Sequence, residues 1–134
     1  MGAWGYANFE NDTALDFVWE IEESGVSTII HAIKKINTVA ETEQLDADEC
    51  TEALAAIEYI ATAKGNMSED FPESAEEWMA KYKGTELTDA GLVAESHKAI
   101  DRIKSNSALK ELWAETEDGE SWLKVLEGLK SRIS

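Results

Sequence analysis

The sequence predicts an all-α fold, a compact bundle of about six or seven short helices with an irregular N-terminal arm. Apolar residues recur at intervals of three and four, and no stretch shows the sustained alternation that is typical of a strand. One proline and eight glycines suit helices better than many turns. A length of 134 residues with 43% apolar side chains favours a single helical domain, residues 1–134, with a true core.

The first helix is expected after an arm that covers residues 1–10. Asn11 or Asp12 is expected to cap it, and Gly25 follows its predicted end near Glu23. Its polar residues form one narrow stripe: Asp16, Glu20 and Glu23. Apolar side chains cover the rest: Leu15, Phe17, Val18, Trp19 and Ile21. A helix with so thin a polar face is expected to lie at the centre of the bundle.

The second and third helices are separated by a polar linker, residues 41–45. The second is predicted from about Ser27 to Ala40, with isoleucines toward the core. The third starts at Asp46, which forms a capping box with Glu49, and Gly65 closes it. Its predicted inner face carries Cys50, Ala53, Leu54, Ile57, Ile60 and Ala61, and its predicted outer face carries Asp48, Glu52 and Tyr59.

The second half of the chain predicts four further helices. Ser74 and Glu77 form a capping box for a short helix over residues 75–83. Thr88 is expected to cap a fifth helix that ends near Lys104. Residues 105–107 cap a sixth helix, and Gly119 separates it from the last. Tryptophans at helical spacing are expected in the core: Trp19, Trp78, Trp113 and Trp122.

Charge is the most informative feature of this sequence. It has 28 acidic and 12 basic side chains, and a formal charge of −16. Seven carboxylates lie in one stretch without a lysine or arginine: Glu41, Glu43, Asp46, Asp48, Glu49, Glu52 and Glu58. Like charges repel in a compact fold, so a cationic partner would relieve this repulsion on contact. The alternative is a solvated face that maintains solubility.

The sequence also bounds the chemistry of the protein. The excess of carboxylates argues against binding nucleic-acid phosphates or anionic lipid. His31 is expected on the surface and His97 at the core boundary, neither at metal-ligand spacing. Cys50 is the single cysteine, which is expected to be a small buried hydrophobe and fits a reducing cytoplasm. No signal peptide or membrane span is recognised, and no catalytic residue, metal site or cofactor is predicted.

Several segments resemble an uncharacterised bacterial family, domain of unknown function 4259. The opening resemblance lies in Met1-Gly2-Ala3-Trp4-Gly5, Phe9-Glu10-Asn11-Asp12 and Ala14-Leu15-Asp16-Phe17. Later segments are also similar: Glu52–Ala56, Leu109–Trp113, Trp122 and Arg132. The resemblance covers nearly the whole chain, although Tyr6-Ala7-Asn8 stands where the family often has Gly-Thr-Gly. The family has no accepted activity, so the resemblance implies no catalytic residue.

The opening motif has two interpretations. In the structural one, Trp4 and Phe9 lie over the first helix as aromatic clamps, while Asn11 and Asp12 satisfy its free N–H groups. In the alternative, Trp4, Asn11 and Asp12 form a ligand site.

These observations favour a binding protein, not an enzyme, whose acidic face neutralises a cationic protein. Its most concrete form is an immunity protein that covers the basic active site of a nuclease toxin. The expected contacts are, first, Glu41, Glu43, Asp46, Asp48, Glu49 and Glu52, and second, Glu69, Asp70 and Glu73. Two alternatives stay open: a carboxylate-rich, metal-dependent enzyme, and a structural interaction domain of a larger assembly.

Overall fold

The computed structural model describes residues 3–134 and confirms the all-α fold. The α-helices are α1 (Asp12–Ser24), α2 (Val26–Thr38), α3 (Ala47–Ala63), α4 (Glu73–Lys81), α5 (Ala90–Ser105), α6 (Ala108–Ala114) and α7 (Gly119–Arg132). A 3-10 turn, η1 (Glu86–Thr88), precedes α5. Within residues 3–134 no strand forms, and the extended pairings are two isolated bridges, Ala3 with Asn11 and Leu45 with Ser107.

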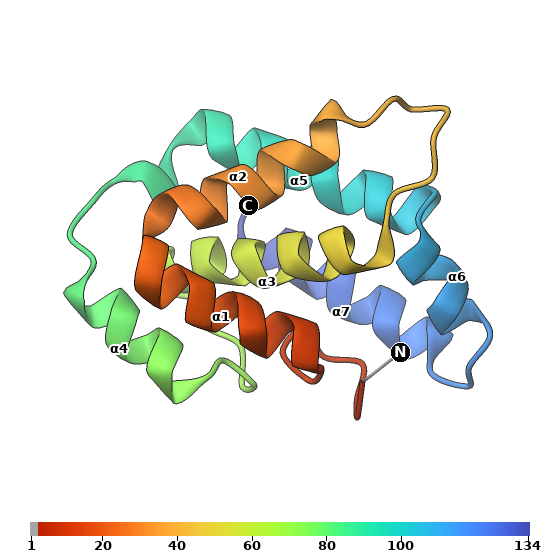
Figure 1. Cartoon of the computed structure of the whole chain (residues 1–134), viewed down its shortest axis with the longest axis horizontal. Helices are drawn as coiled ribbons and strands as arrows, with labels where there is room; N and C mark the ends of the chain where they lie inside the picture. The colour runs from red at the N-terminus through yellow and green to blue at the C-terminus, as the bar shows by residue number, and fades with distance from the viewer. Residues whose placement is uncertain (1–2) are drawn as a thin grey trace.

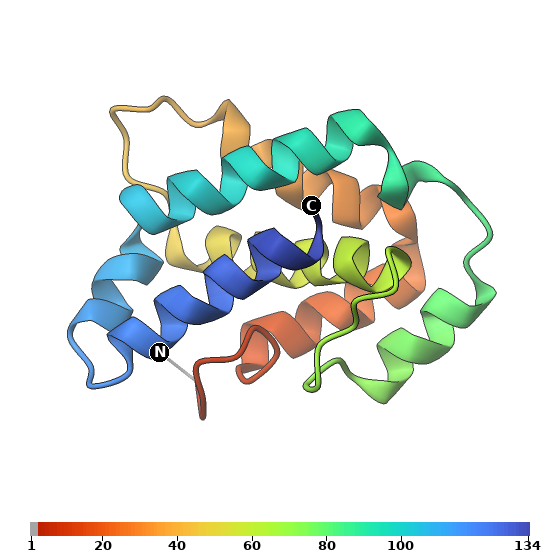
Figure 2. The ribbon, with the colours of Figure 1, turned by 180° about the vertical axis from the view of Figure 1, so that it is seen from behind.

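The central helix is α3, not α1. The ribbon shows α1 and α2 on one side of α3, and α5 and α7 on the other (Figures 1 and 2). Every other α-helix packs against α3, and all residues from Ala53 to Ala61 are buried. A helix that is apolar on all sides belongs inside a protein, and four alanines in this segment let neighbouring helices approach closely.

Two sequence predictions about helix faces are therefore wrong. In α1, Leu15 and Trp19 are 39% and 62% exposed, so this helix buries only one side. In α3, Tyr59 was expected on the outer face and is fully buried. Its ring packs edge-on against Phe9, Phe71 and Trp78. The neighbours of α3 enclose it, so a residue opposite the predicted core face is still inside.

Capping hydrogen bonds fix where most helices begin. The side chain of Asn11 accepts a hydrogen bond from the Ala14 N–H at 2.8 Å, and Asp46 accepts one from Glu49 N–H at 3.1 Å. Ser107 likewise accepts one from Lys110 N–H at 3.0 Å. Each of these bonds satisfies a backbone donor that has no partner within its helix. These three caps confirm the starts of the first, third and sixth predicted helices.

Two predicted caps are wrong. Ser74 does not cap the fourth helix, because α4 already begins at Glu73 after Pro72, whose φ of −63° suits the entry to a helix. Thr88 does not cap the fifth helix, because its hydroxyl donates to the Thr85 carbonyl oxygen inside the 3-10 turn. The next residue, Asp89, accepts from Leu92 N–H at 3.1 Å and takes the capping position.

The tryptophans divide between core and surface. Trp113 and Trp122 are buried as predicted, and Trp78 is partly buried against the core. Trp19 is exposed, contrary to the prediction. Trp4 is 59% exposed, so of the two expected aromatic clamps only Phe9 is buried.

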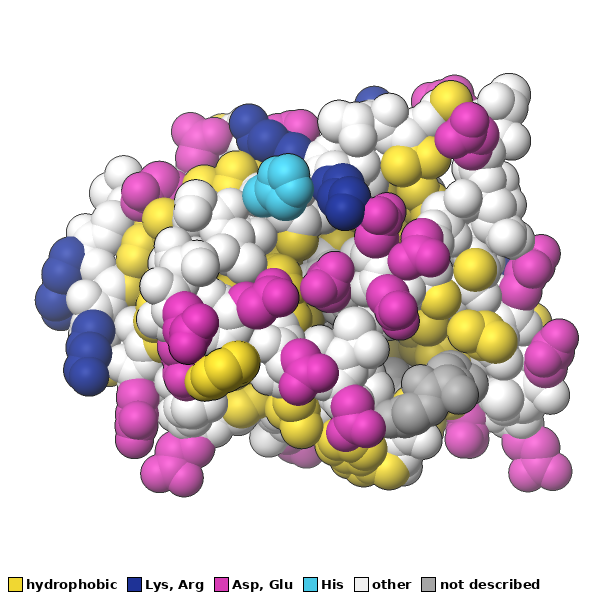
Figure 3. Space-filling view, in the orientation of Figure 1, with side chains coloured by type: hydrophobic (Ala, Val, Ile, Leu, Met, Phe, Trp, Pro, Cys, Tyr) yellow, Lys and Arg dark blue, Asp and Glu magenta, His cyan; other side chains and the backbone are white. Residues whose placement is uncertain are grey.

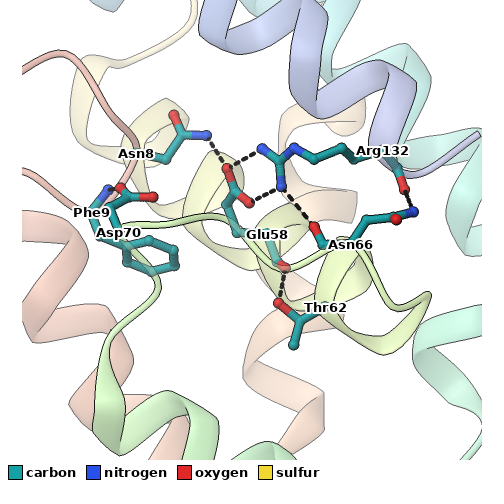
Figure 4. A network of polar contacts seen from close by, with 7 residues as sticks. All are labelled: Asn8, Phe9, Glu58, Thr62, Asn66, Asp70 and Arg132. Atoms are coloured by element: carbon teal, nitrogen blue, oxygen red, sulfur yellow. Dashed lines mark hydrogen bonds and ion pairs between the residues drawn. The ribbon is translucent and has the colours of Figure 1, made fainter.

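One carboxylate of the acidic run lies in the core and holds distant parts of the chain together. Glu58, in the middle of α3, is 1% exposed. Arg132 binds both of its oxygens, Nη1 to Oε1 at 2.7 Å and Nη2 to Oε2 at 2.9 Å. The Nδ2 of Asn8 donates to Oε2 at 2.7 Å (Figure 4). This network joins the N-terminal arm, α3 and the end of α7, so Glu58 is a structural residue and not part of a surface.

Candidate functional site

The nine predicted contact carboxylates lie near the two ends of α3, not on one surface. Six precede this helix or lie in its first turns, whereas Glu69, Asp70 and Glu73 follow its C-terminal end. The loop that carries the second group folds back to the N-terminal arm, where Asp70 accepts a hydrogen bond from Phe9 N–H. The two groups therefore lie on different elements, and at least one member of the second group is tied to the arm.

Several of the nine side chains already have partners within the protein. Asp46 is the cap of α3, and Asp70 accepts a hydrogen bond from Phe9 N–H at 2.9 Å. Glu49 forms an ion pair with Lys35, Nζ to Oε1 at 3.0 Å. Asp46 and Asp70 thus help to hold the fold, which the charge pattern alone did not indicate.

Glu41 and Glu43 lie in the exposed loop between α2 and α3, beside basic residues of α5. They line a surface groove together with Lys98 and Arg102. The guanidinium of Arg102 holds the end of α2 by donating to the carbonyl oxygen of Ile36 at 2.6 Å. These two acids therefore have basic side chains beside them, as Glu49 has in Lys35.

The remaining acids join a set on α1 that the sequence reasoning did not select. The space-filling view shows acidic side chains gathered over α1 and the first turns of α3, with one basic side chain at their border beside the cyan histidine and the other visible Lys and Arg farther away (Figure 3). We call this surface the acidic face. It comprises Asp12, Asp16, Glu20, Glu22, Glu23, Asp46, Asp48, Glu49 and Glu52. Of these nine carboxylates, which all lie in the described part of the chain, only Glu49 is ion-paired.

A signal for α1 was present in the sequence. Residues 1–33 contain six acids and no lysine or arginine, a longer stretch without basic residues than the one from Glu41 to Glu58. The acids of α1 are spaced among apolar residues, so they are less dense than those from Glu41 to Glu58. Their spacing indicates the polar stripe of an amphipathic helix and does not by itself indicate a binding surface. Only the packing of α1 against α3 shows that the two sets share a face.

Glu20 of α1 and Glu52 of α3 lie close enough for their negative charges to repel each other. Both side chains line a groove of about 510 Å³ where α1, α2 and α3 come together, with His31 and Lys35 on its other side. Partial burial raises the pKa of Glu52, and the negative charge of Glu20 raises it further, against the attraction of Lys35. The charged form of Glu52 is thus disfavoured in the free protein, and a cation placed here would stabilise it.

A small cavity lies beside the N-terminal arm, between the starts of α1 and α3 and the α6–α7 segment. It has a volume of about 90 Å³, and its lining includes Asn8, Asn11, Asp48, Trp113 and Trp122. A drug-sized ligand needs about 300 Å³ or more. Of the three residues of the alternative ligand site, Asn11 lines this cavity and is used as the α1 cap, whereas Trp4 and Asp12 do not line it.

The remaining candidate groups for chemistry are dispersed. Cys50 is fully buried as predicted, and burial raises its pKa to about 12, so its thiol stays protonated and unreactive at neutral pH. His31 is exposed, and His97 Nε2 lies 3.4 Å from the Ser134 hydroxyl. Among residues 3–134, no three His, Cys, Asp or Glu side chains converge as metal ligands would. None of the helices described has both the length and the apolar character of a membrane span.

A family model matches most of the chain. The model of a family described as "Domain of unknown function (DUF4259)" matches residues 2–125, which includes the acidic face. Arg132 lies beyond the matched segment. No curated protein matches the chain, and no solved structure matches it.

Proposed function

The chain belongs to the DUF4259 family, a domain of unknown function, and we propose that it is an acidic protein-binding module. In its most concrete form it is a bacterial immunity protein that acts in the cytoplasm. There it would cover the basic active site of a nuclease-type toxin.

The observation that carries this proposal is the lack of compensating cations on the acidic face. Eight of its nine carboxylates have no ion-pair partner within the described residues. Glu52 illustrates the consequence, because burial and the nearby Glu20 disfavour its charge in the free protein. Positive groups on a partner would remove this electrostatic penalty. The relief of repulsion would then contribute to the free energy of binding.

Nuclease active sites supply the matching chemistry. They bind phosphates and are therefore lined by lysine and arginine, which a negatively charged protein surface can contact in place of the substrate. Opposite potentials also speed the encounter of the two proteins, because long-range attraction orients them before contact. The net charge of −16 extends this attraction well beyond the contact surface at low ionic strength.

The test uses the product of the adjacent reading frame as the candidate toxin. A triple variant, Asp16→Asn, Glu20→Gln and Glu52→Gln, removes three charges from the acidic face. A matched control, Glu115→Gln, Glu117→Gln and Glu120→Gln, removes three exposed charges near the α6–α7 loop. Stopped-flow association and inhibition of nuclease activity are measured at several salt concentrations.

We expect the acidic-face variant to associate about tenfold more slowly at low salt, and the control to change the rate by about twofold or less. Affinity of the unmodified protein should fall steeply as salt rises. Equal effects of the two triple variants would mean that binding depends on net charge and not on this face. An affinity independent of salt would contradict the electrostatic mechanism.

A further inference from the structure

Two large apolar side chains stand exposed within the acidic face. Leu15 and Trp19 are one helical turn apart on the outer side of α1, and Trp19 is 62% exposed. Positions four apart lie on the same face of a helix, so the two form one apolar patch. Acidic residues of the same helix border it: Asp16, Glu20, Glu22 and Glu23.

The fold does not account for this patch. The buried side of α1 consists of Ala14, Phe17, Val18 and Ile21, and the cap at Asn11 fixes the start of the helix. Trp19 takes part in none of the aromatic pairs between described residues, which involve Phe9, Tyr59, Phe71, Trp78 and Tyr82. An indole left in water forgoes the free energy of burial that the core tryptophans gain.

From this arrangement we infer that Leu15 and Trp19 are the apolar anchor of the docking surface, inserted into an apolar pocket of a cationic protein. This inference rests on the proposed function and identifies the residues at the centre of the surface that contacts the partner. Tryptophan is enriched among the few residues that dominate binding energy, which typically lie at the middle of an interface within a polar rim. Here the rim is acidic, so the partner's pocket must be bordered by lysine and arginine.

Charge complementarity selects this occupant over the other candidates. A second copy of the chain would bring nine further carboxylates against those of the acidic face, and each copy carries −16. An anionic membrane would be repelled for the same reason. A cationic protein surface with an apolar pocket matches both the apolar patch and its acidic border.

The experiment uses two defined helical peptides as probes. One has leucines along one face and lysines along the other, and the second has serine in place of every leucine. Calorimetry measures the affinity of the full chain and of three variants: Trp19→Ala, Leu15→Ala and the control Trp4→Ala. Trp4 suits as a control because it is 59% exposed and lies outside α1. Circular dichroism verifies that each variant is folded.

We expect Trp19→Ala to weaken binding of the Lys/Leu peptide at least tenfold, Leu15→Ala less, and Trp4→Ala about twofold or less. The Lys/Ser peptide should bind more weakly and respond little to Trp19→Ala. Equal effects of Trp19→Ala and Trp4→Ala would overturn the inference. Equal affinity of the unmodified protein for the two peptides would also overturn it. So would a lack of binding of the Lys/Leu peptide at millimolar concentration. A dimer that depends on Trp19 in sedimentation would also overturn it, in favour of a second copy.

The acidic-face triple variant separates this inference from the proposed function. If that variant binds both peptides less tightly while Trp19→Ala has no effect, the acidic face attracts cations and the anchor is wrong. If Trp19→Ala weakens binding and the triple variant does not, the anchor stands and the electrostatic function is wrong.

Discussion

Two glutamates of α3, less than two turns apart, have opposite surroundings. Glu52 is half-buried beside Glu20, and Asp48 and Glu49 add further negative charge. Glu58 is almost fully buried, and Arg132 and Asn8 satisfy both of its oxygens. Glu58 has a direct counter-ion inside the protein, whereas Glu52 forms no ion pair and has Lys35 as its nearby cation. The comparison teaches that the carboxylates of an acidic run must first be sorted by whether they have a partner inside the protein. Only then can any of them be assigned to the binding of another protein.

The largest effect is expected from removing the cation of the buried pair. Arg132→Ala would leave the Glu58 carboxylate buried without its counter-ion, which costs about 3–5 kcal/mol of unfolding free energy. Urea denaturation followed by circular dichroism measures this loss. Lys130→Ala is the control, because Lys130 lies on the same helix as Arg132 and its ion pair with Asp101 of α5 is exposed and worth about 1 kcal/mol or less. Similar losses in the two variants would remove the distinction between the inner and outer carboxylates.

A smaller loss is expected from the amide that completes the network. Asn8→Ala removes a 2.7 Å hydrogen bond to a charged, buried oxygen, a change worth about 1.5–3 kcal/mol. Asn66→Ala serves as the control, because its exposed side chain donates only to the Arg132 carbonyl oxygen at 2.8 Å. The same denaturation assay applies. A loss no greater than that of the control would show that Arg132 alone is sufficient to hold Glu58.

The smallest effect, with opposite sign, is expected at Glu52. Its pKa is raised in the folded protein, so its charged form destabilises the fold above that pKa and the penalty is absent below the unfolded value of about 4.3. Glu52→Gln should therefore raise Tm slightly at pH 7, and the gain should vanish as the pH falls below about 4. Thermal unfolding at several pH values measures this. A lower Tm than the unmodified protein at pH 7 would mean that attraction to Lys35 outweighs burial and repulsion.

An exposed glutamate provides the control for that measurement. Glu117→Gln, in the loop between α6 and α7, changes the net charge equally without touching the acidic face. Its Tm change should be smaller at pH 7. If the two variants gained equally, the gain would come from net charge and not from the neighbours of Glu52.

Local signals made much of this fold predictable. Caps at Asn11, Asp46 and Ser107 depend on bonds between residues three apart, so the sequence contains all that forms them. The spacing of the isoleucines in α2 likewise places its buried side correctly, with Ile29, Ile33 and Ile36 in the core. These features need no knowledge of tertiary packing.

The wrong caps at Ser74 and Thr88 are local errors of one residue or two, whereas the errors about burial concern contacts between distant residues. Periodicity could not show that α3 is enclosed on all sides, because its alanines give a weak apolar signal and Tyr59 lies opposite the expected core face. For the same reason it could not show that Trp19 faces solvent. Glu58 meets Arg132 across 74 positions and Asn8 across 50, so the spacing of the acidic run does not distinguish it from the exposed carboxylates of that run.

The ion pair between Arg132 and Glu58, 74 positions apart, has a consequence for the order in which the helices can pack together. During synthesis the helix bearing Glu58 leaves the ribosome long before the guanidinium that neutralises it. Until then the carboxylate keeps its hydration shell, because stripping that water without a counter-charge is unfavourable. The growing chain can therefore form α1, α2 and α3 early, but the side of α3 around Glu58 stays wet until the final turn of α7 docks.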